Sequence, residues 1–371
     1  MTPLERYQID LEQAHFIADE AQLNAVKKTQ QLYESLLSRP SGTSSLINRF
    51  FSKPAAPIPW LYLLGGTGRG KTYLVDCFYE CLPFKEKHRI HFHRFMRETH
   101  KQLQQAKGIP NPLDHIVGEF AKKIRVLCLD EFHVSDIGDA MIMSGLLQAM
   151  LNQGITLVTS SNTAINNLYR NGLQRERFLP AIALLKHHAI EVDLGNGQDY
   201  RFHLQKQNES YHIVKKGEND HTRLERIMTQ ISPCPPKHGR NIEINDRDIA
   251  YIALADDVIW FDFDALCNTP RSAADYLNIA EMFHTVIISG VRIMKESNDD
   301  VATRFIHLID ALYDHQVKLV VSASTEMQQL YQGRLLAEPF KRTVSRLNEM
   351  TSERYMSLPH LPTRQAAAQS S

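Results

Sequence analysis

The chain has 371 residues, balances 42 Lys and Arg against 42 Asp and Glu, and is 43% hydrophobic. This length allows two or three domains of roughly 100–200 residues, each large enough to bury a core. The net charge of zero argues against a protein that coats nucleic acid or an anionic membrane, because such binding grows with the number of cationic contacts.

The apolar runs and the start of the chain predict a cytoplasmic protein without an integral membrane segment. The longest apolar runs, such as Val126 to Leu129, are far shorter than the roughly 20 residues that span a bilayer. Residues 1–20 lack the apolar centre of a signal peptide and the Arg and Ser bias of a transit peptide. The five cysteines are odd in number and lack zinc-ribbon spacing, which predicts reduced and mostly buried thiols.

Residues 1–58 are predicted to form a helical N-terminal segment. Asp19 and Gln22 have the spacing of a helix-start capping pair, and apolar residues then recur at helical intervals at Leu23, Val26, Tyr33 and Leu37. A run rich in Ser, Gly and Pro at residues 38–45, and the prolines just before Trp60, interrupt this pattern.

Residues 59–194 alternate apolar, strand-like runs with helical stretches. The strand candidates are WLYLL, RIHFHRF, RVLCL and ITLVTSS, and the pattern ends near AIEVDL, Ala189 to Leu194. Strands that alternate with helices indicate an α/β fold in which a parallel sheet is covered by helices on both faces.

The remainder of the chain divides into a polar stretch and a second α/β region. Residues 195–258 are predicted to be a polar connector with short strands, because residues 205–248 show no sustained periodicity. Residues 259–371 again alternate strand-like and helical runs and end in a tail predicted to be disordered. Their order resembles that of the first region. Two explanations are open: a degenerate duplication, or an accidental match of short apolar runs.

The sequence GGTGRGKT, Gly65 to Thr72, matches the phosphate-loop pattern and lies between an apolar strand and a helical stretch. Its glycines allow backbone N–H groups to converge on phosphate oxygens, Lys71 places a charge on the β- and γ-phosphates, and the Thr72 hydroxyl can ligate Mg²⁺. A chance glycine-rich turn is the weaker alternative. The predicted cofactors are ATP and Mg²⁺, and the predicted binding residues are Gly65, Gly66, Thr67, Gly68, Arg69, Gly70, Lys71 and Thr72.

An acidic pair follows the buried strand RVLCL. Asp130 and Glu131 are expected at its carboxyl end, the edge at which open α/β sheets bind ligands. Asp130 together with Thr72 is predicted to hold Mg²⁺, and Glu131 to be the base or the residue that positions water. Asn162 follows the next strand, where its amide can contact the γ-phosphate or the attacking water.

The segment LYRNGLQRERFLP is predicted to be a helix that ends at Pro180. Its Arg175 and Arg177 are candidates for an arginine finger that reaches the γ-phosphate held by a neighbouring subunit, where it would stabilise transition-state charge. A solvated surface charge is the alternative for each arginine.

Other patterns are less specific. His91 and His93 alternate along an expected strand, as a metal pair would, but no third ligand is placed nearby and a structural role is favoured. The letters DEFH also spell a helicase box, without the second motor core that a helicase needs. Three arginines of the second region could act as sensors or form surface ion pairs: Arg304, Arg342 and Arg346.

Taken together, GGTGRGKTYLVDCFY, HFHRFM, LCLDEFHVSDIGDAMIM, TSSN, LYRNGLQRERFLP, FDFDALC, TRFIHLIDALYD and RTVSRLNEM resemble the bacterial ZapE family of AAA+ ATPases, related to the mitochondrial lactation-elevated ATPase. The match extends from about Tyr62 to Met350. The resemblance implies Mg²⁺-dependent ATP hydrolysis. It further implies Asn162 as the first sensor and Arg177 as the finger, because Arg177 directly precedes FLP.

For the bacterial branch the resemblance implies a role in cell division, in which ATP hydrolysis destabilises polymers of FtsZ at the division site. A homo-oligomer is predicted because an arginine finger acts on a neighbouring subunit. Two departures, Thr67 for the usual Val and Ile165 near the usual Pro, leave the predicted site residues in place. Three alternatives remain open. They are a nucleic-acid loader or translocase, disfavoured by the zero net charge, a module that uses ATP only as a switch, and a quality-control ATPase like the mitochondrial relatives.

Overall fold

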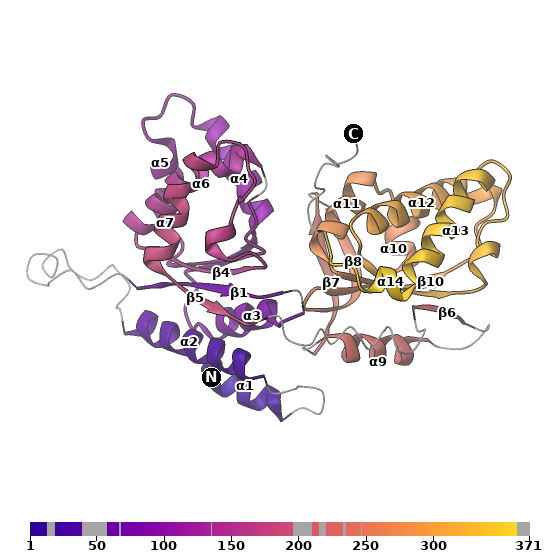
Figure 1. The fold of residues 1–371 in the computed structure, drawn as a ribbon, viewed down its shortest axis with the longest axis horizontal. Coiled ribbons are helices and arrows are strands. Elements are labelled where there is room, and N and C mark those ends of the chain that lie inside the picture. Colours follow the sequence, from indigo (N-terminus) through magenta and orange to yellow (C-terminus); the bar gives the residue numbers. More distant parts are fainter. Residues whose placement is uncertain are drawn as a thin grey trace, which may run out of the picture. The chain divides into compact units, whose positions relative to one another are not determined.

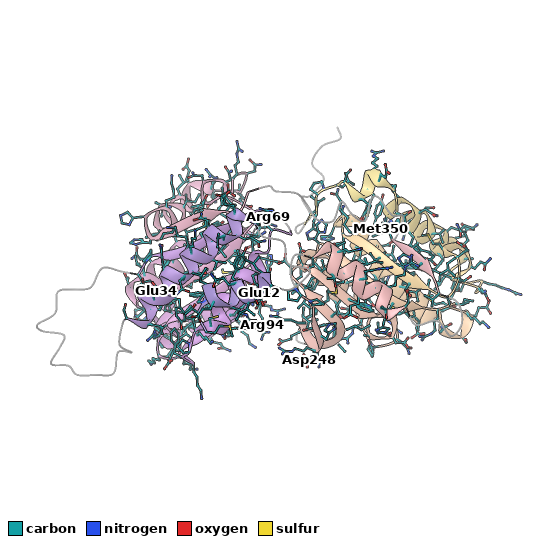
Figure 2. The ribbon with its side chains drawn as sticks, turned by 90° about the horizontal axis from the view of Figure 1, so that it is seen from below. Glu12, Glu34, Arg69, Arg94, Asp248 and Met350 are labelled. Carbon is teal, nitrogen blue, oxygen red and sulfur yellow. The ribbon has the colours of Figure 1, made fainter. Side chains whose placement is uncertain are left out.

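The computed structural model describes residues 1–12, 19–38, 58–66, 68–134, 136–195, 210–214, 220–232, 235–245 and 247–361. The chain divides into two compact units, Met1–Gly197 and Gln198–Ser371, and each is described by itself. Figure 1 shows the ribbon of both units and Figure 2 their side chains.

The first unit alternates helices and strands from Trp60 onward. Its elements are α1 (Pro3–Leu11), α2 (Glu20–Leu37), β1 (Trp60–Leu64), α3 (Lys71–Cys81), β2 (Lys87–His91), α4 (Phe92–Gln105), α5 (Pro112–Ala121), β3 (Val126–Asp130), α6 (Ile137–Asn152), β4 (Thr156–Ser161), the 3₁₀ turns η1 (Ile165–Asn167) and η2 (Arg175–Arg177), α7 (Leu179–His188) and β5 (Ala189–Asp193).

The strands of this unit form one five-stranded sheet in the order β2-β3-β4-β1-β5. Every pairing between them is parallel, as predicted. In the register, Leu64 of β1 is opposite Ser161 of β4, and Leu129 of β3 is opposite Thr159 of β4. The ends of β1, β3 and β4 therefore meet at one edge, with β4 between the other two strands.

Helices cover both faces of the sheet, because its central strands are apolar on both sides. α4, α5, α6 and α7 lie on one face, and α1, α2 and α3 on the other (Figure 1). Leu127 and Leu129 belong to the core under α4–α7. Cys128 and Asp130 alternate with these leucines, so their side chains are on the α3 face of the sheet.

The helical N-terminal segment packs on this α3 face. Asp19 caps α2 by accepting hydrogen bonds from the N–H groups of Ala21 and Gln22, at 2.8 and 3.2 Å. The buried stripe of α2 includes Ala25, Val26, Thr29, Leu32, Tyr33 and Leu36. Leu37, which recurs at the same helical spacing, ends α2 and is 45% exposed. Polar Gln22 and Thr29 occupy buried positions that hydrophobic periodicity does not reveal.

The second unit contains β6 (Tyr211–Ile213), α9 (His221–Ile231), β7 (Lys237–Ile244), β8 (Arg247–Ala255), β9 (Val258–Asp262), α10 (Phe263–Cys267), α11 (Ala273–Met282), β10 (Thr285–Val291), η3 (Glu296–Asn298), α12 (Asp299–Asp314), β11 (Lys318–Ala323), η4 (Met327–Gln329), α13 (Ala337–Met350) and α14 (Glu353–Met356). Its sheet has six strands in the order β6-β11-β10-β9-β8-β7. The β7-β8 and β8-β9 pairs are antiparallel and the other pairs are parallel.

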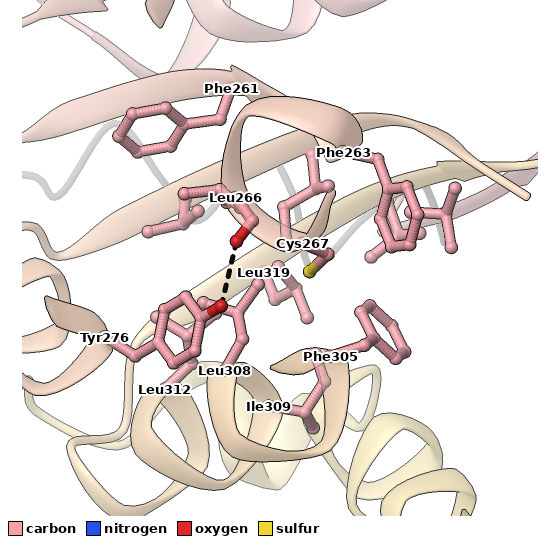
Figure 3. Packing of buried hydrophobic residues seen from close by; sticks show 14 of the residues in the cluster. Phe261, Phe263, Leu266, Cys267, Tyr276, Phe305, Leu308, Ile309, Leu312 and Leu319 are labelled. Carbon is pink, nitrogen blue, oxygen red and sulfur yellow. Dashed lines mark hydrogen bonds between the residues drawn. The ribbon is translucent and has the colours of Figure 1, made fainter. Parts of the chain in front are cut away.

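The main core of the second unit lies between this sheet and helices α10–α13. Figure 3 shows part of it, where Phe263 and Phe305 pack together and the Tyr276 hydroxyl donates to the Leu266 carbonyl at 2.8 Å. A smaller cluster lies under α9 on the opposite face of the sheet and includes Trp260. Both faces of this second sheet are thus covered.

Residues 195–258 are more regular than the predicted connector. They contain β6, α9, β7 and all of β8, and these strands belong to the second sheet. Leu224, Ile227, Met228 and Ile231 have the spacing of an amphipathic helix, which the polar composition of the stretch concealed. β7 is an edge strand and its largely exposed residues need no apolar pattern.

One predicted strand was wrong. The run RIHFHRF is not one strand, since β2 ends at His91 and α4 begins at Phe92.

Cys77, Cys128 and Cys267 are buried free thiols and Cys81 is a partly exposed one, as predicted, whereas Cys234 lies outside the described residues. Within the described ranges, each helix is too short or too polar to span a bilayer.

Candidate active site

The phosphate loop connects the end of β1 to the start of α3. Gly68 and Gly70 have φ angles of 72° and 73°, the left-handed backbone that glycine adopts without strain. The Lys71 Nζ donates to the carbonyl oxygens of Gly65 and Gly66 at 2.9 and 2.6 Å. The loop therefore surrounds the Lys71 ammonium group at the N-terminus of α3. This positive charge and the helix N-terminus together attract phosphate. Thr67 lies outside the described residues.

The first glycine of the loop is held against two strand ends. The Gly65 N–H donates to the Ser161 carbonyl at 3.1 Å. A Cβ added to Gly65 would lie 3.0 Å from the Cβ of Leu194, tighter than ordinary packing. A side chain at this position would thus push the loop away from the ends of β4 and β5.

The side chain of Arg69 turns into the protein. Its guanidinium donates to the Leu194 carbonyl from Nε at 2.9 Å and from Nη2 at 2.6 Å. Nη2 also pairs with Asp19 Oδ2 at 2.6 Å, and the Gln22 amide donates to the Arg69 carbonyl at 3.1 Å. Arg69 thus links the loop to α2 and to the end of β5, which its place among the predicted phosphate-binding residues did not suggest.

The acidic pair lies where β3 ends. Asp130 is the last residue of β3 and is 3% exposed. Glu131 has a φ angle of 55°, a conformation that is uncommon outside glycine and is often found at functional sites. Its N–H donates to Ser160 Oγ at 3.1 Å, and the next N–H, of Phe132, donates to the Ser160 carbonyl at 2.7 Å. The end of β4 therefore holds the turn that presents Glu131.

Arg89, in the middle of β2, contacts the buried carboxylate. Its Nε donates to Asp130 Oδ2 at 2.6 Å, and its Nη1 forms an ion pair with Asp76 of α3. Asp130 Oδ1 is buried and has no hydrogen-bond partner within the described part of the chain. The residues fit Mg²⁺, because this unpartnered carboxylate oxygen and the Thr72 hydroxyl are the hard oxygen donors that Mg²⁺ prefers.

Asn162 follows β4 at the same edge and is exposed. The adjacent turn is fixed by two hydrogen bonds: the Tyr62 hydroxyl donates to the Thr163 carbonyl at 2.5 Å, and the Thr163 N–H donates to Ser161 Oγ at 3.1 Å. Burial raises the pKa of Tyr62, so its hydroxyl remains a donor. The strand register thus brings Asn162, the phosphate loop and the acidic pair to one edge.

The arginine-bearing segment is not the predicted helix. It forms the 3₁₀ turn η2, and α7 begins at Leu179 with Pro180 in its first turn. Proline is favoured at that position because an N–H in the first turn of a helix has no intrahelical acceptor, so nothing is lost when proline lacks one. Arg175 Nη2 donates to the Asn166 carbonyl at 2.9 Å, whereas Arg177 is exposed.

The histidines do not form the alternating pair that was considered. His91 ends β2 and His93 lies in α4, so the strand alternation stops between them. No cluster of three or more His, Cys, Asp or Glu side chains suited to a metal occurs among the described residues. Burial lowers the pKa of His91, which favours its neutral form.

The three arginines considered as sensors in the second unit make contacts within that unit. Arg304 Nε donates to the Cys267 carbonyl at 2.6 Å. Arg342 pairs with Asp310 at 3.1 Å, and Arg346 pairs with Asp310 and, at 3.7 Å, with Asp314. These contacts match the ion-pair alternative.

A parallel sheet in which one strand separates the phosphate-loop strand from the acidic strand, with helices on both faces, defines a P-loop ATPase core of the AAA+ class. The chain belongs to the AFG1-like ATPase family, whose model matches residues 1–359. The resemblance stated from the sequence is thereby confirmed, and the protein is an ATP hydrolase.

Individual relatives match different shares of the chain. The cell division protein ZapE of Escherichia coli K12 is 38% identical over 373 residues, covering 97% of this chain and 99% of its own. Lactation elevated protein 1 homolog B of Danio rerio is 30% identical over 349 residues, covering 82% and 69%. The crystal structure of DnaI covers 48% of this chain and 86% of its own, at 19% identity and a TM-score of 0.34.

Proposed function

We propose that this ATPase uses Mg²⁺-dependent ATP hydrolysis in cell division to destabilise or remodel FtsZ polymers. The observation that carries the proposal is the 38% identity to Escherichia coli cell division protein ZapE over 97% of this chain and 99% of that protein. FtsZ as the client follows from the resemblance to the bacterial branch. In this proposal residues 59–194 are the ATPase core, and the protein is cytoplasmic and recruited to the division site.

The phosphate loop binds the triphosphate of ATP. Backbone N–H groups of the loop and the N-terminus of α3 face the phosphates, and Lys71 exchanges its bonds to the Gly65 and Gly66 carbonyls for phosphate oxygens. Thr72 and Asp130 hold Mg²⁺. In such sites the metal neutralises charge that develops on the β- and γ-phosphate oxygens.

Glu131 and Asn162 act on the attacking water. Glu131 orients the water and accepts its proton. The turn that follows β3 is bonded to Ser160 of β4, and this bond fixes the direction of the Glu131 side chain. The exposed amide of Asn162 senses the γ-phosphate from the same edge.

Arg177 is the finger that acts on the γ-phosphate held by a neighbouring copy of the chain. Arg175 is committed to the Asn166 carbonyl of its own chain, and this contact supports Arg177 as the arginine that reaches outward. A finger that acts between subunits requires a homo-oligomer.

A pelleting assay of FtsZ polymers with this protein tests the client. The wild-type chain with ATP and Mg²⁺ is expected to reduce polymer mass or length, and Glu131→Gln, which binds ATP without turnover, is the matched control. An unchanged polymer mass and length would remove the division role. Hydrolysis stimulated by DNA or RNA in a salt-dependent manner would instead favour the loader or translocase alternative.

A further inference from the structure

Arg89 connects two acidic side chains that come from different elements of the first unit. Asp130 ends β3, and Asp76 belongs to α3, the helix that begins at Lys71 and includes Thr72. The Arg89 guanidinium contacts both, with Nε on Asp130 Oδ2 at 2.6 Å and Nη1 on Asp76 Oδ1. One cation therefore ties the acidic strand to the helix of the phosphate loop.

The burial of these groups makes the connection more than a surface ion pair. The side chains of Arg89, Asp76 and Asp130 are 19%, 20% and 5% exposed. Solvent screens such pairs less than exposed ones, and charge-assisted hydrogen bonds hold their geometry more firmly. The carboxylate of Asp130 is thus oriented through one of its oxygens, Oδ2.

The other oxygen of the Asp130 carboxylate, Oδ1, is open to a ligand. Oδ1 is buried and has no hydrogen-bond partner within the described residues, so its lone pairs are available to a ligand. Two carboxylates against one guanidinium leave the cluster of Asp76, Asp130 and Arg89 with a net negative charge, which favours a further cation. The planar fork of arginine can serve both acids in fixed directions, which the single ammonium of lysine cannot do.

We propose that Arg89 is a positioning residue for the metal site: it holds Asp130 by Oδ2 so that Oδ1 faces Mg²⁺, and through Asp76 it fixes Asp130 relative to Thr72. This inference rests on the proposed function, in which Asp130 and Thr72 hold the metal. Arg89 acts through Asp130 and does not contact the reacting atoms.

The test compares Arg89→Lys and Asp76→Asn, because Arg89→Ala would leave buried carboxylates without a cation and is expected to unfold the unit. Binding of a fluorescent ATP analogue is measured across a Mg²⁺ titration and again in EDTA, with thermal unfolding of each variant as the check on folding. Arg89→Lys is expected to raise the Mg²⁺ concentration for half-maximal binding about 10- to 100-fold. Its affinity for the analogue in EDTA stays at the wild-type value, and Asp76→Asn shows a smaller increase in the Mg²⁺ requirement.

Two further variants separate the possible failures. Arg94→Lys is the matched control, since Arg94 pairs with Glu98 at 3.0 Å on the exposed face of α4 and should leave the Mg²⁺ requirement unchanged. Asp130→Asn should raise that requirement. If Asp130→Asn raises it while folded Arg89→Lys does not, the positioning role is overturned and the metal assignment stands. If Asp130→Asn has no effect, the metal assignment fails and the positioning role fails with it.

Discussion

Asp19 at the start of α2 and Arg69 in the phosphate loop form an ion pair of 2.6 Å across 50 positions of sequence. Both side chains are largely buried, and Arg69 also donates to the Leu194 carbonyl. Gln22, in the first turn of α2, donates to the Arg69 carbonyl from its side-chain amide. Helix α2 is therefore bonded directly to the phosphate loop, and we expect the helix and the loop to move together when nucleotide binds.

Asp19→Asn is expected to destabilise the first unit by about 1–3 kcal/mol, because it leaves a buried guanidinium without its charged partner. Asparagine is as good a helix cap as aspartate, so the substitution separates the ion pair from the cap. We also expect weaker ATP binding, since the loop loses a support. Thermal unfolding and a nucleotide titration measure the two effects.

Glu20→Gln is the control for Asp19→Asn, because Glu20 is the neighbouring exposed acid in the same helix turn. It removes one negative charge at the N-terminus of α2 without touching Arg69. Equal unfolding temperatures and ATP affinities for the two variants would show that the link to Arg69 has no energetic role.

Lys71→Ala is expected to weaken ATP binding by about 10- to 100-fold, the value of a charge-assisted contact. The fold should survive, since Lys71 Nζ donates to the Gly65 and Gly66 carbonyls of its own loop and these bonds join no other element. Calorimetric titration with ATP measures the change. Wild-type affinity and hydrolysis in this variant would remove the phosphate loop from the site.

Glu131→Gln is expected to lower kcat by about 10²- to 10⁴-fold, because the amide cannot accept a proton from water. Affinity for ATP should be retained, so the variant traps bound ATP. Glutamine keeps the side-chain length, and the backbone contact with Ser160 does not depend on the carboxylate. Wild-type turnover in this variant would exclude Glu131 as the base.

The parts of the site that the sequence predicts are those fixed by local pattern and by the geometry of parallel sheets. Lys71 opens α3, Asp130 ends β3 and Asn162 follows β4, and parallel strands bring their ends to one edge. Arg89 and Asp76 were missed because their pairing depends on tertiary packing. The one available signal for Arg89 was a charged residue inside the short strand KHRIH.

The errors in the fold have equally specific causes. Pro180 was interpreted as the end of a helix, although proline is equally suited to the first turn of one, and α7 begins there. In residues 195–258 an edge strand and a one-sided helix are polar in composition, and composition alone indicated a connector. Periodicity of Leu224, Ile227 and Ile231 would have been the better guide.

Arg177→Ala is expected to lower ATP hydrolysis by about 10³- to 10⁵-fold while ATP affinity and the unfolding temperature stay at wild-type values. Arg177 is exposed, so its removal leaves no packing defect. Arg175→Ala should instead lower the unfolding temperature, because it releases the Asn166 carbonyl.

A mixing experiment tests whether Arg177 acts between subunits. At an ATP concentration near the wild-type Kd, Lys71→Ala binds little ATP and Arg177→Ala cannot complete a neighbour's site, so each has low activity alone. Mixed oligomers contain sites with an intact phosphate loop from one chain and an intact Arg177 from the other, and partial activity should return. No recovery at any ratio, with mixed oligomers demonstrated, would exclude a finger supplied by a neighbour.

Cys81 is expected to be the most reactive thiol among the described cysteines. The hydrogen bond with Cys77 lowers the pKa of Cys81 to about 7, whereas that bond and burial raise the pKa of Cys77. Since the thiolate is the nucleophile, alkylation of Cys81 should fall as pH falls through about 7, below the midpoint of about 8.5 for an ordinary thiol.

Peptide mapping of iodoacetamide-labelled protein across pH 5–10 measures the alkylation rate at each cysteine separately. Cys77→Ala removes the hydrogen bond and should move the midpoint for Cys81 upward, towards the ordinary value. Cys128 and Cys267 are buried, and burial raises the pKa of each thiol, so they should label only after unfolding. Labelling of Cys128 before Cys81, or an unchanged midpoint in Cys77→Ala, would contradict the proposed origin of the reactivity.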